Sequence, residues 1–505
     1  MRKIVLILLV LLTSFWGYSQ KQNNVWCFGD SALIDFSDTA NILNGASSID
    51  SRGSCASICD SSGLLLFYSG YDADVYSIGG PPFKGGEIYT KQHSTMDNGD
   101  SIVMAAWYHE VVIVPNPKQV NLFYIFSIGV TGNFGLFVTE IDISQNGGLG
   151  AVIQKNIQLQ SFKQVDCLSA VKHGNGRDWW VVFRKSQFPG GSNNDFYLYL
   201  VTPGGISNVT IQSVGSLNAT NAGKLSFSPD GTKMLFTNYG DLIEVYDFDR
   251  CTGLITNPRT INPQGTTLFY NTWGSEFSPS GDLLYISTSD TVSYLFQYNL
   301  SDVDPQATRD TIWSTQYPQY TGGDLKRAPD GKIYFSCAYD NQIVFNYPYP
   351  DSMYNMYNMN LSVINSPDSL GAACDFQPYS FYLGGKRTYW GLPNNPDYDL
   401  APLVGSACDS LTAVQENELN NTNATLNLYY HPGWETLFVN AQNLKGTKGT
   451  IKIYDTNGKI IYSSPCNIQP PYFTKNIALP DLAGGVYVVQ LQTDKELLVG
   501  KWVCD

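Results

Sequence analysis

A ten-residue segment recurs at a constant interval in the middle of the chain. Three copies lie fifty residues apart, measured between their prolines: FSPDGTKMLF (227–236), FSPSGDLLYI (277–286) and RAPDGKIYFS (327–336). In each copy a Pro-Asp-Gly or Pro-Ser-Gly turn precedes a strand of alternating apolar residues. Proline fixes φ before the turn, and glycine supplies the positive φ that a tight turn needs. A constant interval requires a repeated structural unit.

The repeated unit predicts a β-propeller. A second strand follows the first in two copies, at 242–249 and 294–301. Pairs of strands that recur about every 40–50 residues are typical of propeller blades, which hold four antiparallel strands each. Looser copies of the turn and strand lie upstream, at 60–70, 116–127 and 174–183, which makes six units.

A seventh unit is predicted to close the ring from both ends of the repeat region. Residues 23–37 and 382–393 carry strand-like sequence and together would form one shared blade. We therefore predict an all-β chain that begins with a propeller of seven blades, or alternatively of eight. A large β-sandwich is the other all-β alternative, but it does not explain the constant interval.

Composition favours a β-rich protein without nucleic acid as a partner. Among the 505 residues 13% are aromatic, 15% are charged and 46 are glycine, a mixture typical of strands and tight turns. The net charge of −14 argues against nucleic acid and anionic membrane surfaces, because both favour clustered lysine and arginine.

The first twenty residues have the features of a signal peptide. Arg2 and Lys3 precede an apolar run at 4–12, and residues 19–20 form a suitable cleavage point. The run is too short for a comfortable transmembrane segment, so we expect an exported mature chain with no transmembrane segment. All ten cysteines follow the signal peptide, in a compartment where disulfides form.

Seven segments occur in the order expected of one family: NNVWCFGDSALIDFS, GSCASICDSSGLLLFYS, VVIVPNPKQVNLFYIFS, LSAVKHGNGRDWWVV, FSPDGTKMLF, APDGKIYFS and LSVINSPDSLGAACDFQ. Together they resemble the WD40-like β-propeller domain of exported and surface proteins of Bacteroidetes, of the type associated with gliding motility and surface adhesion. The resemblance covers about residues 23–395 and implies a propeller, without a settled activity. Cys27 and Cys59 depart from the family's usual residues, and because both appear together we predict that they form a disulfide.

Composition changes after the predicted propeller, which we assign to residues 21–395. Residues 396–426 are rich in Asn, Pro, Asp and Ser and are predicted to be a linker. Residues 427–505 carry short alternating strands that suit a small Ig-like β-sandwich.

Three segments of the tail, IKIYDTNGKIIYSS, LPDLAGGVYVVQL and GKWVCD, resemble the C-terminal sorting domain of type IX secretion. The resemblance implies export through the outer membrane, with the type IX secretion machinery and a sortase-like peptidase as partners. The protein would then be secreted or displayed on the cell surface. An accessory adhesion sandwich is the alternative reading of the tail.

Eight Asp-Ser or Asp-Thr dipeptides precede apolar residues and resemble the O-glycosylation signal of exported Bacteroidetes proteins. The same dipeptides are also common in turns. The candidate acceptors are Ser31, Thr39, Ser101, Thr291, Thr311, Ser352, Ser369 and Ser410. We expect some of them to be modified, with Ser410 in the linker the most exposed.

The sequence contains no motif for a catalytic centre or a cofactor. The metalloprotease, nucleophile-elbow, phosphate-loop and dinucleotide patterns are absent. Two acidic turns, at 247–249 and 302–304, lack the dense acidic loop of a strong calcium site, so no metal is predicted. Among the four histidines, His93 and His109 are the pair that could face a central channel.

Aromatic residues in predicted loops favour a binding surface. The candidates are Tyr317, Tyr320, Tyr354 and Tyr357. A tyrosine ring offers a flat apolar face and a polar hydroxyl to a glycan or a protein. Packing between blades is the alternative role of these rings.

We therefore predict a non-enzymatic propeller that binds a glycan or protein ligand outside the cell. An extracellular propeller hydrolase or lyase acting on a polymer is one alternative, and a structural component of the surface adhesion or gliding machinery is another. A channel lined by acids with a histidine within hydrogen-bond reach would favour the enzyme. A flat aromatic loop face would favour the binding protein.

Overall fold

The structure is a computed structural model of the chain. It describes all residues except 1–20, 72–84, 106, 130–133, 266–270, 291, 317–320, 340–348, 351, 410–423, 432–434, 456–458, 481, 483–484, 496 and 505. The predicted signal peptide therefore lies outside the described residues. Among those described, no helix is long and apolar enough to cross a membrane. The chain forms two compact units, Met1–Thr412 and Ala413–Asp505.

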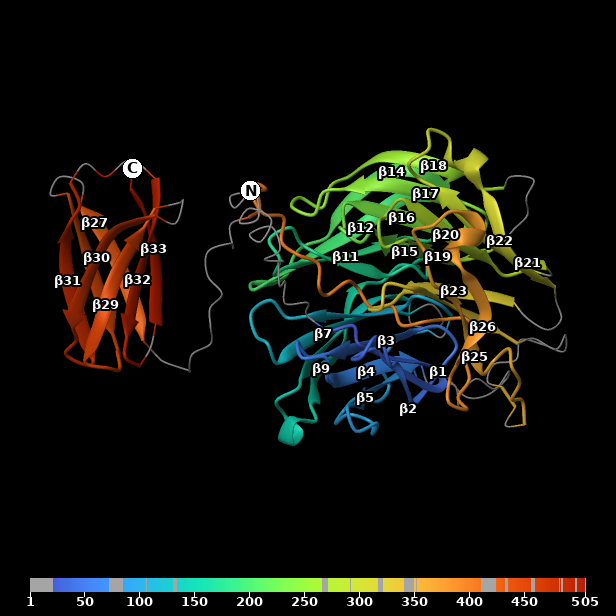
Figure 1. The fold of residues 1–505 in the computed structure, drawn as a ribbon, viewed down its shortest axis with the longest axis horizontal. Coiled ribbons are helices and arrows are strands. Elements are labelled where there is room, and N and C mark those ends of the chain that lie inside the picture. Colours follow the sequence, from blue (N-terminus) through green and yellow to red (C-terminus); the bar gives the residue numbers. More distant parts are fainter. Residues whose placement is uncertain are drawn as a thin grey trace, which may run out of the picture. The chain divides into compact units, whose positions relative to one another are not determined.

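The first unit is an all-β propeller of seven antiparallel sheets, as the repeat predicted (Figure 1). Five sheets contain at least four strands, hydrogen-bonded mostly in sequence order. Their strands are β6 (Val111–Pro115), β7 (Leu122–Gly129), β8 (Gly135–Asp142), β9 (Ala151–Gln160); β10 (Ser169–Lys172), β11 (Trp179–Arg184), β12 (Asn193–Thr202), β13 (Gly205–Ile206), β14 (Thr210–Asn218); β15 (Gly223–Phe227), β16 (Lys233–Asn238), β17 (Ile243–Phe248), β18 (Ile255–Asn262); β19 (Thr272–Phe277), β20 (Leu283–Thr288), β21 (Val292–Asn299), β22 (Asp310–Gln316); and β23 (Thr321–Arg327), β24 (Ile333–Ala338), β25 (Asn360–Ile364), β26 (Phe376–Tyr382).

Two smaller sheets come from the start of the chain. They are β1 (Val25–Asp35) with β2 (Leu43–Ser51), and β3 (Cys55–Cys59) with β4 (Leu65–Tyr71) and β5 (Gly86–Thr90). Short 3-10 helices lie at Asn146–Gly148, Pro305–Thr308 and Gly371–Cys374. The first strands of successive sheets contact each other, which is how blades are arranged around a propeller axis.

The repeat turns adopt the geometry that their sequence dictates. Gly231, Gly281 and Gly331 have φ values of 71°, 79° and 79°, in the region that glycine enters without steric cost. The N–H of each glycine donates to the carbonyl three residues earlier, at 2.8, 2.9 and 3.0 Å respectively. Each turn therefore links the first strand of a blade to the second.

The two ends of the repeat region meet at one isolated bridge. Asp30 on β1 forms an isolated antiparallel bridge with Arg387, and the Asp30 N–H donates to the Arg387 carbonyl at 2.9 Å. Their side chains also form an ion pair. The ring is thus closed by a segment from the C-terminal end of the propeller that lies against the N-terminal strand.

Residues 387–408, which we name the closing segment, then continue across the first strands of other blades. The Asn394 N–H donates to the Cys55 carbonyl at 2.8 Å, and the Leu403 N–H donates to the Gly174 carbonyl at 2.7 Å. The Tyr398 hydroxyl donates to the Ile113 carbonyl at 2.8 Å. Residues 396–408 were assigned to the linker because of their polar composition, but these residues pack on the propeller and satisfy its backbone groups.

The predicted disulfide between Cys27 and Cys59 is not formed in the structure, where both residues are free and buried thiols. They lie in an apolar cluster with Trp26, Phe28 and Tyr68, and in such surroundings a thiol packs as a small apolar group. The structure instead joins Cys251 to Cys408.

The second unit is a small β-sandwich of seven strands in two sheets. One sheet has the order β27-β28-β31 and the other β30-β29-β32-β33. The strands are β27 (Thr425–His431), β28 (Thr436–Gln442), β29 (Lys448–Tyr454), β30 (Ile460–Asn467), β31 (Tyr472–Ala478), β32 (Gly485–Thr493) and β33 (Leu497–Cys504). Its own apolar core includes Val439, Ile451 and Trp502, so the sandwich does not depend on the propeller for burial.

Candidate functional site: an axial pocket

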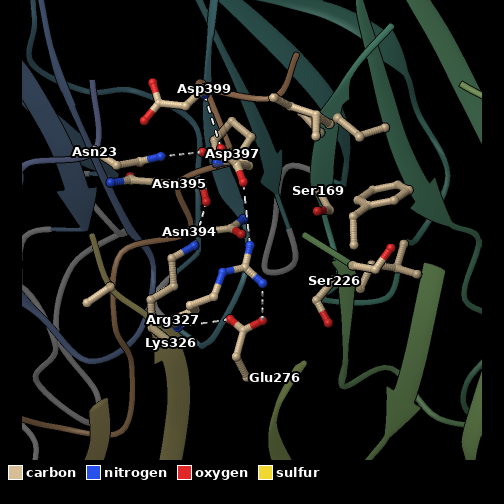
Figure 2. Close-up of a pocket in the computed structure, with 18 of the residues that line it drawn as sticks. Asn23, Ser169, Ser226, Glu276, Lys326, Arg327, Asn394, Asn395, Asp397 and Asp399 are labelled. Carbon is tan, nitrogen blue, oxygen red and sulfur yellow. Dashed lines mark hydrogen bonds and ion pairs between the residues drawn. The ribbon is translucent and has the colours of Figure 1, made fainter. Parts of the chain in front are cut away.

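A polar cavity of about 270 Å³ lies where the first strands of four propeller sheets end (Figure 2). Its wall comes from β10, β15, β19 and β23, from the start of β1 and the residues before it, from His109 before β6, and from residues of the C-terminal closing segment. The turn residues Ser228 and Pro329 of two repeats stand beside it. We call this cavity the axial pocket.

The fifty-residue interval places equivalent residues of neighbouring blades on the pocket wall. The residues three positions before the repeat prolines are Ser226, Glu276 and Lys326, and all three line the pocket. Side chains two apart on a strand point to the same face, so the residues five positions before the prolines belong to the same face: Lys224, Gly274 and Asp324. The spacing of these residues from the repeat prolines is visible in the sequence. It could therefore have predicted which residues line the pocket.

Lys224, Asp324 and His109 form a buried network of polar side chains. Lys224 Nζ is 2.7 Å from Asp324 Oδ1, and His109 Nε2 is 3.4 Å from Asp324 Oδ2, with all three side chains buried. Burial alone would raise the pKa of Asp324, but Lys224 and His109 outweigh it and hold this pKa well below its usual value. Burial lowers the pKa of His109, whereas the neighbouring Asp324 acts in the opposite direction.

Gly274 makes this network possible because it leaves space between the blades of Lys224 and Asp324. A Cβ at Gly274 would lie 2.6 Å from the Gly323 carbonyl oxygen and 2.9 Å from Asp324 Cα. Gly274→Ala is therefore expected to lower the free energy of unfolding by about 1–3 kcal/mol, the usual cost of overpacking.

Denaturant unfolding measures this effect, with Gly204→Ala as the control. A Cβ at Gly204 would find its nearest neighbour, Thr202 Oγ1, at 3.4 Å, so the control should change stability by less than about 0.5 kcal/mol. Equal stabilities of the two variants would contradict the close packing at Gly274.

A second layer of charges surrounds the opening. Arg327 Nη1 is 3.9 Å from Glu276 Oε1, and Arg327 Nη2 is 3.5 Å from Asp397 Oδ2. The Lys326 ammonium donates to the Asn395 carbonyl, and Figure 2 shows these side chains converging from β23 and the closing segment. Burial lowers the pKa of Lys326 to about 8.

Several buried polar atoms on the wall lack a hydrogen bond. Among the described residues these atoms are Asn23 Oδ1, Trp26 Nε1, Ser226 Oγ, Arg327 Nη1 and His109 Nδ1. Trp26 is 1% exposed and His109 is 2% exposed. Buried polar groups are normally hydrogen-bonded, so a wall that gathers these atoms is suited to a polar molecule that enters the pocket.

The structure places the candidate site residues from the sequence in different parts of the propeller. His109 lines the axial pocket, whereas the His93 ring lies 3.1 Å from the Tyr68 hydroxyl, away from the pocket. Tyr354 is exposed beside Arg387, but Tyr357 packs against the rings of Tyr339 and Tyr379.

Tyr317 and Tyr320 lie outside the described residues. The structure therefore brings no flat face of tyrosines together among the residues that it describes.

The candidate glycosylation residues are accessible where they are described. Thr39, Ser101, Thr311 and Ser352 are exposed, and Ser31 and Ser369 are partly exposed. Thr291 and Ser410 lie outside the described residues. Their modification stays a prediction.

Comparison with known families shows what the C-terminal sandwich resembles. Residues 427–505 match the secretion system C-terminal sorting domain. The tail of type IX secretion thus marks the chain as an exported protein. No curated protein matches the chain.

Solved structures similar to the chain are propeller proteins. One is a candidate 6-phosphogluconolactonase from Bacteroides fragilis, with 12% identity, a TM-score of 0.41, and coverage of 68% of this chain and 91% of that one. Another is a quinonprotein alcohol dehydrogenase-like protein from Bacteroides thetaiotaomicron, with 11% identity, a TM-score of 0.37, and coverage of 74% and 75%. A third is the periplasmic gluconolactonase of Pseudomonas aeruginosa, with 13% identity, a TM-score of 0.34, and coverage of 79% and 96%. These values are too low to transfer an activity.

Proposed function

We propose that the protein is a secreted or surface-displayed binding protein whose axial pocket holds the end of a glycan. The sorting domain supports delivery to the outside of the cell. The pocket supports binding, since its wall combines charged groups, amides and hydroxyls with apolar side chains such as Trp26 and Leu400.

The buried polar atoms without hydrogen bonds carry this proposal. Leaving a buried donor or acceptor unpaired costs about 1–3 kcal/mol, and a sugar offers both donors and acceptors to such atoms. The cavity of about 270 Å³ is slightly smaller than the roughly 300–1,000 Å³ of small-molecule sites. One or two terminal sugar units match this size better than a folded protein surface does.

A glycan array probed with the full mature chain tests the proposal. Ser226→Phe is expected to abolish pocket-dependent binding, because Ser226 lines the pocket and a phenylalanine ring at this position would occupy the space of the ligand. Ser37→Phe, at an exposed turn, makes the same change away from the pocket and should bind as the parent does. Binding that Ser226→Phe leaves unchanged would place the ligand elsewhere, and stable co-purification with surface proteins instead would favour the structural role.

A polymer hydrolase or lyase is the second candidate, supported by groups that titrate near neutrality. Burial lowers the pKa of Lys326 to about 8, and burial together with Asp397 raises the pKa of Asp399 to about 7. General acids and bases work best with a pKa near the working pH. Incubation of array-positive glycans with the chain, followed by assay of new chain ends, tests this alternative.

A further inference from the structure

We propose that the axial pocket selects a ligand that carries an oxyanion, whether carboxylate, sulfate or phosphate, and that Lys326 binds this group together with Arg327 and Trp26. The inference rests on the proposed function, because it names the chemical class of the ligand for the same pocket.

Lys326 is a cation on the pocket wall without a carboxylate partner. Its ammonium has three N–H donors, and one donates to the backbone carbonyl of Asn395. The ion pairs among the described residues involve Lys224 and Arg327 but not Lys326. A buried charge is normally paired, so the ammonium is poised to bind an anion that enters the pocket.

Three acids near Lys326 form ion pairs with other cations. Arg327 lies between Glu276 and Asp397, and Lys224 pairs with Asp324. Lys326 itself therefore has no carboxylate within ion-pair distance among the described residues. An oxyanion can pair with its ammonium without displacing an existing ion pair.

Two of the unpaired atoms on the pocket wall can only donate. Trp26 Nε1 and Arg327 Nη1 have no hydrogen bond among the described residues, and neither group can accept one. An oxyanion presents several acceptor lone pairs, and hydrogen bonds in which a partner is charged are roughly twice as strong as neutral ones. These two donors and the Lys326 ammonium favour an oxyanion over a neutral hydroxyl group.

Ligand binding should be coupled to protonation. The charged groups that influence Lys326 are Glu276, Lys224, Asp324 and Arg327, with Asp397 and Asp399 on the closing segment. Burial lowers the pKa of Lys326 to about 8, and a bound anion favours the charged form. Binding at pH 8 should therefore take up about half a proton per ligand.

Isothermal titration calorimetry of the full chain tests the inference with one neutral hexose and its uronate, sulfated and phosphorylated forms. At least one anionic form is expected to bind about tenfold or more tightly than the neutral hexose, since one charge-assisted hydrogen bond suffices for this difference. Lys326→Gln should remove the preference and the proton uptake. Lys326→Arg should keep much of the preference, and Lys118→Gln, an exposed lysine on an outer turn, should change nothing.

The outcomes separate this inference from the proposed function. If no anionic form binds more tightly than the neutral hexose, or if Lys326→Gln keeps the preference, the oxyanion site is wrong. Neutral glycans that still bind in a manner sensitive to Ser226→Phe would leave the proposed function standing. A preference for one anionic form identifies the group that the pocket recognises. Thermal unfolding of Lys326→Gln serves as the folding control and should match the parent, because the substitution breaks no ion pair.

Discussion

A chain that ends at residue 409 is expected to fold but to stay inside the outer membrane. Residues 427–505 match a secretion system sorting domain, and the truncation removes the part of the chain that implies interaction with the secretion machinery. The propeller should survive the truncation, because no strand pairing joins the two units among the described residues. Cell fractionation in a bacterium with type IX secretion should find nearly complete loss from the surface and the medium.

Point variants of the tail show whether export needs the folded sorting domain or only the presence of a C-terminal segment. Trp502 is buried and stacks on Tyr487 in the core of the sandwich, so Trp502→Ala should reduce export as the truncation does. Tyr472 is 63% exposed, and Tyr472→Ala should be exported normally. Surface display of the truncated chain, detected by protease accessibility on intact cells, would show that export does not depend on the tail.

The architecture was accessible from sequence because its signals are local and repeated. Turn chemistry at Gly231 and its two counterparts fixes each blade, and alternation along the strands fixes which side chains face inward. The closure of the ring was also predictable, since Asp30 and Arg387 lie in the two strand-like end segments that remained without a partner.

The site was harder to predict because it depends on contacts between distant blades. Lys224 and Asp324 are ordinary charged residues in the sequence, and only the closed ring of blades brings Lys224 Nζ to 2.7 Å from Asp324 Oδ1. The part of the closing segment after residue 395 escaped prediction for another reason. Its Pro and Asp residues are typical of a linker, but the Tyr398 hydroxyl donates to a backbone carbonyl of the propeller.

The prediction of a disulfide between Cys27 and Cys59 failed for the same reason. The prediction for Cys27 and Cys59 rested on the resemblance to a family and not on geometry. The observed partner of Cys251 lies 157 residues further along the chain, and sequence alone does not determine which cysteines meet.

Loss of the Cys251–Cys408 disulfide is expected to lower the free energy of unfolding by about 2–4 kcal/mol, because a bond that closes so long a loop strongly restricts the unfolded chain. The pair lies against Gly174, where a Cβ would come within 2.5 Å of Cys408 Sγ, so the backbone is packed directly on the bridge. The double variant Cys251→Ser with Cys408→Ser avoids an odd thiol. Chemical denaturation measures the loss, and Cys466→Ser, which removes a free thiol of the sandwich, is the control.

The same variant tests whether the closing segment serves the pocket as well as the fold. This segment carries Asn395, which accepts the Lys326 hydrogen bond, and Asp397, which pairs with Arg327. If the disulfide holds the segment in place, the double variant should bind its ligand more weakly even at temperatures where the propeller is fully folded. Unchanged affinity together with reduced stability would mean that the hydrogen bonds of Asn394 and Tyr398 position the pocket residues without the bridge. Unchanged stability, or a free Cys408 in non-reducing peptide maps, would contradict the disulfide itself.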